Sequence, residues 1–305
     1  MEKAFFSLLL KKKALELGFD ACGIAPVEPL TEEILYLQHW LSQKHNAEMK
    51  YMERYVEKRE NPAVLVENAA SLIVVLMSYN PLQRQPSEIP QIAYYAYGND
   101  YHHIMHDKLN SLFLFLQEHY PAAKGRAFVD TAPVMEKAWA MRAGLGWIGK
   151  NTMLINPALG SFTFIAELIV NIALTCDKPE TRDYCANCTK CMDACPTKSI
   201  KKPFTLNANK CIAYHTIENK ETTDMATSGY LFGCDICQKV CPWNKKATTH
   251  RHSGIMPLPE IMYYTTDDYL AMNEDTFHTV FFNSPLKRAG LEKLKATAAK
   301  LSLYT

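Results

Sequence analysis

The sequence predicts an α/β domain over residues 1–175, a cysteine-rich domain over 176–250 and a short helical C-terminal segment over 251–305. Helical and strand-like segments alternate up to about residue 175, which is typical of an α/β domain. Eight of the ten cysteines then lie between Cys185 and Cys241, in a stretch too poor in apolar residues to build a large core. The tail after residue 250 has the spacing of short helices.

The expected elements follow from apolar periodicity and from turn residues. Helices are expected over residues 2–17, 31–43, 103–118 and 135–142, with Gly18 ending the first and Thr31 capping the second. Strands are expected over 21–24, 71–79, 127–129 and 161–174. The run 71–79 is continuously apolar, as in a buried strand. A basic helix over about 284–301 is expected to end the chain.

The composition excludes several classes of protein. With 48% hydrophobic and 21% charged residues, the chain is neither disordered nor fibrous. It carries 33 Lys and Arg against 32 Asp and Glu, so the overall charge gives no argument for a nucleic-acid partner. The longest apolar runs, such as 72–77, are too short to span a membrane, and the N-terminus lacks the cleavage site of a signal peptide. We therefore expect a cytoplasmic protein.

The cysteine spacing predicts two [4Fe–4S] clusters. The first run, CxxCxxCxxxCP, begins at Cys185 and ends at Cys195, and a second run from Cys234 to Cys241 lacks one ligand, which Cys211 can supply. In bacterial ferredoxins the last cysteine of such a run ligates the other cluster. We therefore expect cluster 1 on Cys185, Cys188, Cys191 and Cys241, and cluster 2 on Cys195, Cys211, Cys234 and Cys237.

Two other uses of the cysteines fit less well. A disulfide scaffold is unnecessary in a chain long enough to bury a core. Zinc sites usually use two CxxC pairs about 15–20 residues apart, which is not the spacing here. Of the two remaining cysteines, we expect Cys22 to be a buried side chain, and Cys176 lies just before the cluster domain. Two clusters in one small domain would relay single electrons.

Several further segments resemble epoxyqueuosine reductases. These are GNDYH at 98–102, DTAPVMEK at 130–137, AGLGWIGKNT at 143–152, CIAY at 211–214, TIE at 216–218, FGCDICQ at 232–238 and CPWN at 241–244. The match covers about residues 20–285. The resemblance implies a cobalamin enzyme related to reductive dehalogenases, with a nitroreductase-type catalytic domain and with clusters that feed electrons to cobalt. The implied reaction is the last step of queuosine synthesis, which removes the epoxide oxygen of epoxyqueuosine at the wobble position of tRNA.

The resemblance assigns the role of proton donor to Asp130, which follows an expected strand. A carboxyl group can protonate the departing oxygen. To hold a proton at pH 7 its pKa must lie well above about 3.9, which burial against a corrin face would achieve. The alternative is that Asp130 caps a helix beginning near Pro133.

Tyr101 and His102 are expected beside the reactive face of the cofactor. A DxHxxG motif would predict a histidine ligand to cobalt, but Met105 occupies the last position of that motif. The family binds cobalamin without such a ligand, which agrees with this departure. His102 is therefore expected in the site rather than on the metal.

The glycines Gly144, Gly146 and Gly149 match neither of the phosphate-binding loop patterns. They could allow close approach of the backbone to a bulky ligand. The resemblance then extends the cobalamin site to Arg54, Lys150, Asn151, Thr152, Leu154, Ser161 and Ala213.

Basic residues concentrate locally despite the neutral total. Residues 190–251 carry ten Lys and Arg against five Asp and Glu, and residues 281–305 carry five against one. Such patches suit phosphate binding, although a solvated basic face is the alternative. The candidate tRNA contacts are Arg142, Lys220, Lys245, Lys246, Lys287 and Arg288. Longer family members add a C-terminal helical-repeat domain, for which 305 residues leave no room, so the hold on the tRNA body stays open.

Two other functions compete with tRNA reduction. One is a corrinoid enzyme that acts on a small molecule, as reductive dehalogenases do, and the other is an electron-transfer ferredoxin fused to a structural domain. The partners expected for the leading hypothesis are tRNA that carries epoxyqueuosine and an external one-electron donor such as flavodoxin or ferredoxin. We expect a monomer.

Overall fold

The computed structural model describes residues 2–221 and 224–303, so Met1 and residues 304–305, at the outer ends of the expected terminal segments, lie outside it. A four-stranded sheet of order β1-β2-β7-β4 forms its centre, with every neighbouring pair antiparallel. The strands are β1 (Ala21–Pro26), β2 (Ser71–Ser78), β4 (Gly125–Phe128) and β7 (Thr163–Val170). The alternation of helices and strands therefore encodes a mixed α/β fold, without the parallel sheet typical of βαβ units.

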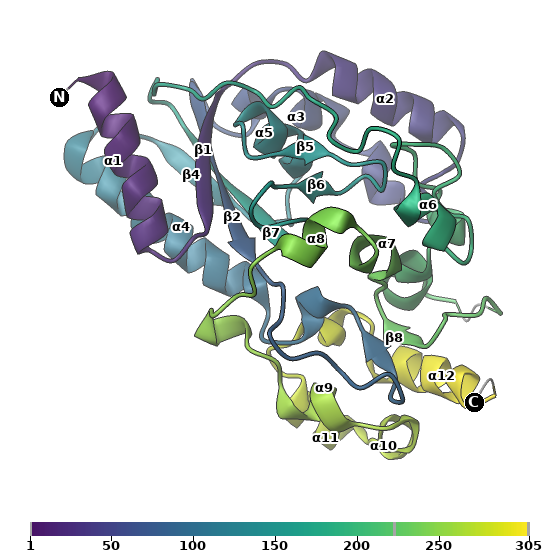
Figure 1. The fold of residues 1–305 in the computed structure, drawn as a ribbon. Coiled ribbons are helices and arrows are strands. Elements are labelled where there is room, and N and C mark those ends of the chain that lie inside the picture. Colours follow the sequence, from purple (N-terminus) through teal and green to yellow (C-terminus); the bar gives the residue numbers. More distant parts are fainter. Residues whose placement is uncertain (1, 222–223, 304–305) are drawn as a thin grey trace.

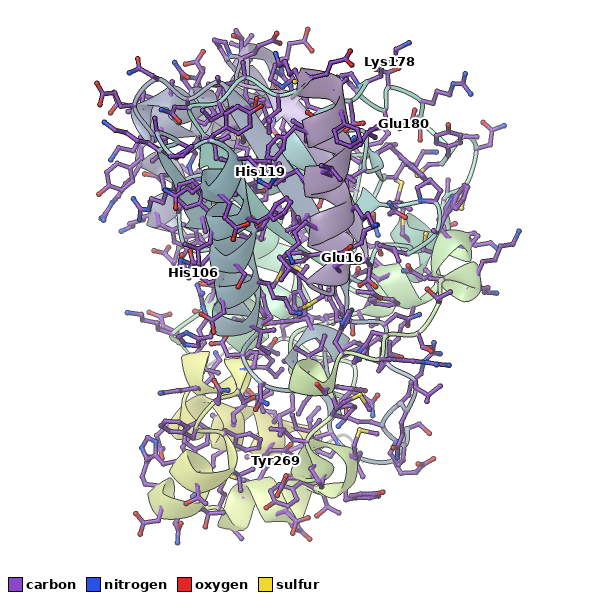
Figure 2. All side chains as sticks on the ribbon, turned by 90° about the vertical axis from the view of Figure 1, so that its left-hand side faces the viewer. Glu16, His106, His119, Lys178, Glu180 and Tyr269 are labelled. Atoms are coloured by element: carbon purple, nitrogen blue, oxygen red, sulfur yellow. The ribbon has the colours of Figure 1, made fainter. Side chains whose placement is uncertain are left out.

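Helices cover both faces of this sheet (Figure 1). Helices α1 (Lys3–Glu16) and α4 (Tyr101–His119) pack on one face, and α5 (Glu136–Arg142) packs on the other. Figure 2 shows α1 and α4 side by side, with His106 and His119 on α4 and the C-terminal helices beyond one end of the sheet. The expected bounds agree with the structure to within two residues for these helices, because their apolar spacing is regular.

Other short elements complete the first 175 residues. They are α2 (Thr31–Ser42), α3 (Val56–Glu60), β3 (Gln91–Ile92), β5 (Trp147–Ile148) and β6 (Leu154–Ile155), with 3-10 turns at Lys50–Glu53, Pro62–Val64 and Tyr94–Ala96. The expected cap of α2 is wrong. Thr31 is the first residue inside that helix, and the preceding Leu30 makes no side-chain cap.

The cysteine-rich segment consists of short helices joined by loops. It contains α6 (Lys190–Ala194), the 3-10 turn Ala208–Lys210, the π-helix η5 (Tyr214–Glu218), β8 (Tyr230–Phe232), α7 (Ile236–Lys239) and α8 (Pro242–Lys246). Strand β8 pairs in parallel with β3, which ties this segment to the first one.

The C-terminal segment packs as short helices around Tyr269, which is fully buried (Figure 2). Its elements are α9 (Pro259–Tyr263), α10 (Thr266–Ala271), α11 (Glu274–Val280) and α12 (Leu291–Leu301), with 3-10 turns at Ser253–Ile255 and Pro285–Arg288. The expected helix over 284–301 is thus a 3-10 turn and a separate helix, divided at Gly290 with a φ of +79°. Within the described residues, no helix is long and apolar enough to cross a membrane.

One hydrophobic core joins the three expected segments. It contains Phe6 and Leu10 of α1, Phe232 of β8, and Leu294 and Ala298 of α12. A second core lies on the opposite face of the sheet, between the strands and α5. All three expected segments therefore contribute residues to the first core.

Candidate active site and iron–sulfur centre

Asp130 lies in the loop that follows β4 and leads to α5. Its φ of +53° is in the left-handed region, where Asp is tolerated better than most residues but is still uncommon. Its backbone N–H donates to Oε1 of Glu136 at 2.6 Å. Its side chain is 51% exposed, so the carboxylate is accessible to a ligand.

Two side chains from the start of α4 meet this carboxylate. Tyr101 donates its hydroxyl to Oδ2 of Asp130 at 2.9 Å, and its ring stacks on Phe164 at 4.0 Å. His102 places Nε2 3.6 Å from Oδ2 of Asp130. Its Nδ1 lies 2.5 Å from Oδ1 of Asp100, the residue that caps α4. The structure thus brings together the three residues that were expected at the reactive face.

The expected rise in the pKa of Asp130 depends on burial against a corrin face, and the residues of the chain by themselves shift this pKa the other way. The hydrogen bond with His102 outweighs burial and, with that of Tyr101, lowers the pKa of Asp130 instead of raising it. Burial lowers the pKa of His102, but hydrogen bonds and charge from Asp100 and Asp130 outweigh it and raise the pKa to about 9. At neutral pH, in the absence of ligand, Asp130 is ionised and His102 holds the proton.

The helix-cap alternative for Asp130 is not what the structure shows. No helix begins at Pro133; α5 begins at Glu136, and the preceding Met135 makes no side-chain cap. The side chain of Asp130 instead faces Tyr101 and His102.

The expected glycine loop is used by the chain itself. A Cβ atom at Gly146 would lie 2.2 Å from the carbonyl oxygen of Ile155, and one at Gly144 would lie 2.6 Å from that of Lys178. At Gly149 it would lie 2.5 Å from Cδ1 of Ile155. The close approach that these glycines permit is therefore to neighbouring backbone and side chains of this protein, rather than to a bulky ligand.

Lys150 and Ser161 make internal contacts where cofactor contacts were expected. The buried ammonium of Lys150 donates to the carbonyl oxygens of Ala186 and, at 3.1 Å, of Cys188. The hydroxyl of the buried Ser161 donates to Gln238 at 2.8 Å and accepts from Asn244 at 2.9 Å. Both side chains fasten the first segment to the cysteine-rich one.

The other residues expected at the cofactor lie in different loops and elements. Asn151 is buried and its side-chain N–H group has no hydrogen-bond partner among the described residues, so it retains a free donor. Thr152 has a φ of +64° and accepts from Lys137 through its carbonyl oxygen at 2.8 Å. Leu154 is buried in β6, Ala213 directly precedes the π-helix, and the carbonyl oxygen of Arg54 accepts from Arg59.

Four cysteines line one cavity of about 260 Å³. They are the set expected for cluster 1: Cys185, Cys188, Cys191 and Cys241. Lys150 and Asn151 line the same cavity, and the rings of Trp147, Tyr184 and Trp243 contact one another beside it. The fourth thiolate, Cys241, comes from the second cysteine run and directly precedes α8. Helix α8 follows α7, and α7 packs against α6, so the second run lies beside the first.

The set expected for cluster 2 also lies together. Burial, followed by the charges of Cys211, Asp235 and Cys195, raises the pKa of Cys234 to about 12, and the charges of Cys234 and Cys211 help to raise that of the buried Cys237. Within the described residues no three Cys, His, Asp or Glu side chains are close enough to hold a single metal ion.

The two cysteines outside the runs behave as packing residues. Burial raises the pKa of Cys22 in β1 to about 12, so its thiol stays protonated. Cys176 packs at the edge of the first core, and its Sγ contacts the carbonyl oxygen of Leu174.

Two of the six candidate tRNA contacts are already paired with acidic residues. Arg142 makes a two-pronged ion pair with Glu33, both distances being 3.2 Å, and Arg288 lies 2.7 Å from Glu218. Neither keeps a full free charge for a phosphate. Lys246 lines the cluster-1 cavity, and Lys287 lies over the exposed ring of Phe282. Lys220 and Lys245 are exposed.

Sequence reasoning missed a second concave basic surface. A cavity of about 240 Å³ lies between α2 and the loop 198–210. Four lysines line it with two aromatic rings: Lys198, Lys201, Lys202, Lys210, Tyr36 and Trp40. The local excess of Lys in 190–251 pointed to the loop, but only the fold brings the rings of α2 to it.

Two acidic residues were also missed. Glu136 lies in the DTAPVMEK segment and bonds to the backbone of Asp130. Glu167 is fully buried in β7. In the sequence, Glu167 stands out as the single charged residue within the largely apolar run 163–170.

Comparison with known proteins agrees with this combination of features. A family model described as "4Fe-4S double cluster binding domain" matches residues 184–244, and one described as "Epoxyqueuosine reductase QueG, DUF1730" matches residues 59–131. The cluster domain and the acid–histidine site therefore define an iron–sulfur oxidoreductase.

Whole-chain relatives are more specific. An epoxyqueuosine reductase of Cellulophaga algicola is 44% identical over 94% of this chain and 95% of its own length, and one of Leadbetterella byssophila is 43% identical over 96% and 97%. The chain belongs to the epoxyqueuosine reductase family.

Solved structures show the same fold. An epoxyqueuosine reductase with an epoxyqueuosine-modified tRNA stem loop has a TM-score of 0.88 at 29% identity, over 97% of this chain and 80% of that one. The Bacillus subtilis enzyme, described with a catalytic aspartate loop swung out of the active site, has a TM-score of 0.87 at 29% identity and the same coverage. A catabolic reductive dehalogenase shares the fold at a TM-score of 0.50 and 18% identity, over 100% of this chain and 37% of that one.

Proposed function

We propose that this protein reduces epoxyqueuosine to queuosine at the wobble position of tRNA, with cobalamin and two [4Fe–4S] clusters as cofactors and Asp130 as proton donor. The observation that carries the proposal is the half-exposed Asp130, bonded to Tyr101 and close to His102, in a chain of this family. We also propose the nitroreductase type for the catalytic domain, which the helix-covered antiparallel sheet supports.

The residues present fit both cofactors. Two sets of four cysteines lie together, one of them around a cavity. For cobalamin, the half-exposed carboxylate of Asp130 beside Tyr101 and His102 offers an accessible polar site. The free N–H donor of Asn151 lies in the cluster-1 cavity. When bound, cobalamin supplies low-potential electrons at the epoxide carbon, and the clusters carry those electrons from an external one-electron donor such as flavodoxin or ferredoxin.

The acid–histidine site handles the protons. Conversion of an epoxide to an alkene uses two electrons and two protons, and the oxygen leaves as water. His102 holds a proton at neutral pH and lies beside Asp130, so the pair can present an acidic proton to the departing oxygen. The hydroxyl of Tyr101 orients the carboxylate by donating to Oδ2.

A tRNA substrate is favoured over a small molecule. Basic side chains line a concave surface between α2 and the loop 198–210, and a relative of the same fold is known with a tRNA stem loop. Because tRNA is modified in the compartment where it is used, the cytoplasm is the expected location of this protein. The expected oligomeric state is a monomer.

Anaerobic reconstitution followed by nucleoside analysis tests this proposal. The purified chain, loaded with iron, sulfide and cobalamin, is expected to show corrin absorbance and to convert epoxyqueuosine in tRNA to queuosine when a chemical one-electron reductant is supplied. Reduction of a small halogenated aromatic compound with no action on the tRNA would favour the dehalogenase-like alternative. Absence of any bound corrin would leave electron transfer by the clusters as the only remaining candidate function.

A further inference from the structure

Asn151 carries a buried N–H donor at the cavity that the cluster-1 cysteines line. The residue is 2% exposed, and it lines this cavity together with all four of those cysteines. Its Oδ1 accepts the backbone N–H of Met153 at 3.3 Å, so the loop uses the oxygen end of the amide. The nitrogen end, Nδ2, has no hydrogen-bond partner among the described residues. Because buried polar groups are almost always hydrogen-bonded, this donor indicates an acceptor that the chain itself does not supply.

The loop around Asn151 holds the amide in place. The backbone N–H of Gly149 donates to the carbonyl oxygen of Met153 at 2.8 Å, which closes the loop. A Cβ atom at Gly149 would lie 2.9 Å from Oδ1 of Asn151, so the glycine leaves room for the amide. The neighbouring Lys150 fastens the loop to the carbonyl oxygen of Cys188 at 3.1 Å. The oxygen end is therefore fixed, and the nitrogen end remains free to bond.

Sulfur is the acceptor that this cavity offers. Among the other side chains that line it, the lysines and the tryptophan only donate hydrogen bonds, and the isoleucine and the proline do neither. The hydroxyl of Tyr184 is engaged with Oε2 of Glu180 at 3.2 Å. The four cysteine sulfurs remain, and a bound cluster adds its sulfides to them.

We propose that Nδ2 of Asn151 donates a hydrogen bond to a sulfur of cluster 1 and thereby raises the reduction potential of this cluster. Each reduction adds one negative charge to the cluster, and a hydrogen bond to a more negative acceptor is stronger. The bond therefore stabilises the reduced form more than the oxidised form, and hydrogen bonds to cluster sulfurs are known to set potentials in this way.

This tuning favours the entry of electrons into the protein. In that step the external donor loses one electron and cluster 1 gains it, and a higher potential of cluster 1 makes the transfer more favourable. The exposed residues Lys190 and Lys246 line the same cavity, so cluster 1 lies near a surface that an external donor can approach. The inference goes beyond the proposed function and depends on cluster 1 rather than on the tRNA.

A redox titration of the full chain, loaded with both clusters and cobalamin, tests the effect on potential. Electron paramagnetic resonance follows the signal of cluster 1, which is the one that Cys188→Ser removes. Asn151→Leu keeps a similar volume but has no donor. At a fixed solution potential it should lower the ratio of reduced to oxidised cluster 1 about tenfold, a typical effect of losing a group that hydrogen-bonds a metal site. For a one-electron couple this is a fall of about 59 mV, and the potential of cluster 2 should not change.

Asn187→Leu is the matched control for this titration. It makes the same substitution within the cluster-1 loop, between Cys185 and Cys188, but at an exposed residue that does not line the cavity. Its cluster-1 potential should equal that of the wild type. An Asn151→Leu variant that holds both clusters at the wild-type potentials would overturn the inference.

Hyperfine spectroscopy gives a second measurement, which does not depend on the survival of cluster 1 in Asn151→Leu. The wild-type protein is labelled with ¹⁵N in the side-chain amide of asparagine, and cluster 1 is reduced. We expect a ¹⁵N coupling to the cluster that persists in Asn187→Leu. A labelled wild type without any such coupling, or a coupling that Asn187→Leu abolishes, would contradict the bond from Asn151.

The two measurements also separate this inference from the proposed function. A chain that holds both clusters but never reduces the tRNA would contradict the proposed function, while the titration and the ¹⁵N coupling still decide the role of Asn151. A reconstituted chain that binds no cluster at these four cysteines would overturn the role of Asn151 directly.

Discussion

The conformation of Asp130 shows how one residue of this loop is held for its task. Its left-handed backbone costs about 1–3 kcal/mol in a residue other than glycine, and such strain persists only where neighbouring contacts fix it. Glu136 holds the backbone N–H and Tyr101 holds the carboxylate. The motif around Asp130 predicted its place in the site from sequence. Its ionisation was not predictable, because His102 is 28 residues away in the chain and only folding brings it near.

At this residue we expect Asp130→Asn to lower turnover by about 10²–10⁴, the usual contribution of a general acid. Asn tolerates the left-handed backbone as Asp does, so the loop should keep its shape. Bound cobalamin, iron content and tRNA affinity are therefore expected to stay at wild-type levels, measured on the same preparation. Near-normal turnover would remove Asp130 from the reaction and leave the proton to His102 or water.

His102 should make the stability of the protein depend on pH. Its pKa is raised from 6.5 to about 9, so the folded protein binds this proton more tightly than the unfolded chain does. The resulting stabilisation is complete below pH 6.5 and is lost as the pH rises through about 9. Denaturant unfolding at several pH values should show a flatter dependence for His102→Gln over that window. Parallel curves for the two proteins would show that His102 is not protonated in the fold.

At the scale of elements, the helices and strands were largely predictable while their arrangement was not. Apolar periodicity placed α1, α4 and β2 to within two residues. The antiparallel order β1-β2-β7-β4 depends on contacts far apart in sequence, which local pattern does not encode. The same limit explains Lys150, whose place after a glycine loop indicated a cofactor contact, whereas folding directs its ammonium to the cysteine loop.

Lys150 should hold the cluster-1 loop. Its buried ammonium bonds two carbonyl oxygens of the segment that carries Cys185 and Cys188, and a buried group that loses such a partner costs about 1–3 kcal/mol. We expect Lys150→Met to lose cluster 1 preferentially, so that iron falls from about eight atoms per chain towards four. Lys246→Met, at the rim of the same cavity, is the matched control and should retain both clusters. Equal iron in the two variants would show that the loop does not depend on Lys150.

Each expected cluster takes ligands from both cysteine runs, and this arrangement leads to a second prediction at the scale of elements. Cys195 belongs to the first run but lies with Cys211, Cys234 and Cys237, so Cys195→Ser should damage cluster 2 and spare cluster 1. Electron paramagnetic resonance of the reduced protein, with Cys188→Ser as the comparison, separates the two signals. Loss of the same signal in both variants would mean that each run builds its own cluster.

At the scale of the whole molecule, charge is distributed in local patches rather than as a net excess. Sequence counts located the basic stretches, but the lysines and arginines that remain available depend on acidic partners elsewhere, as Glu33 shows for Arg142 and Glu218 for Arg288. The basic cavity between α2 and the loop 198–210 was not predictable, since its aromatic rings and its lysines are about 160 residues apart.

These patches predict how tRNA binding responds to salt. Lys201→Glu combined with Lys202→Glu, and separately Lys287→Glu, should weaken binding and reduce the slope of log affinity against log salt by about one for each phosphate that the variant no longer neutralises. Arg142→Gln is the control, because its guanidinium is already paired with Glu33, and it should leave the slope unchanged. An unaltered slope in a lysine variant would assign that lysine to a solvated face.

The shared core also sets the order in which a nascent chain can become native. Phe6 and Leu10 near the start pack in the same core as Leu294 and Ala298 near the end. Helix α12 packs on α10, β8 and the π-helix η5, so these elements stay incompletely covered during synthesis until α12 has left the ribosome. The cysteine-rich segment leaves the ribosome before α12. Iron–sulfur assembly factors would therefore meet its thiols before β3, β8 and the surrounding helices have reached their final packing. A chain truncated before α12 should then aggregate rather than accumulate as a partial enzyme.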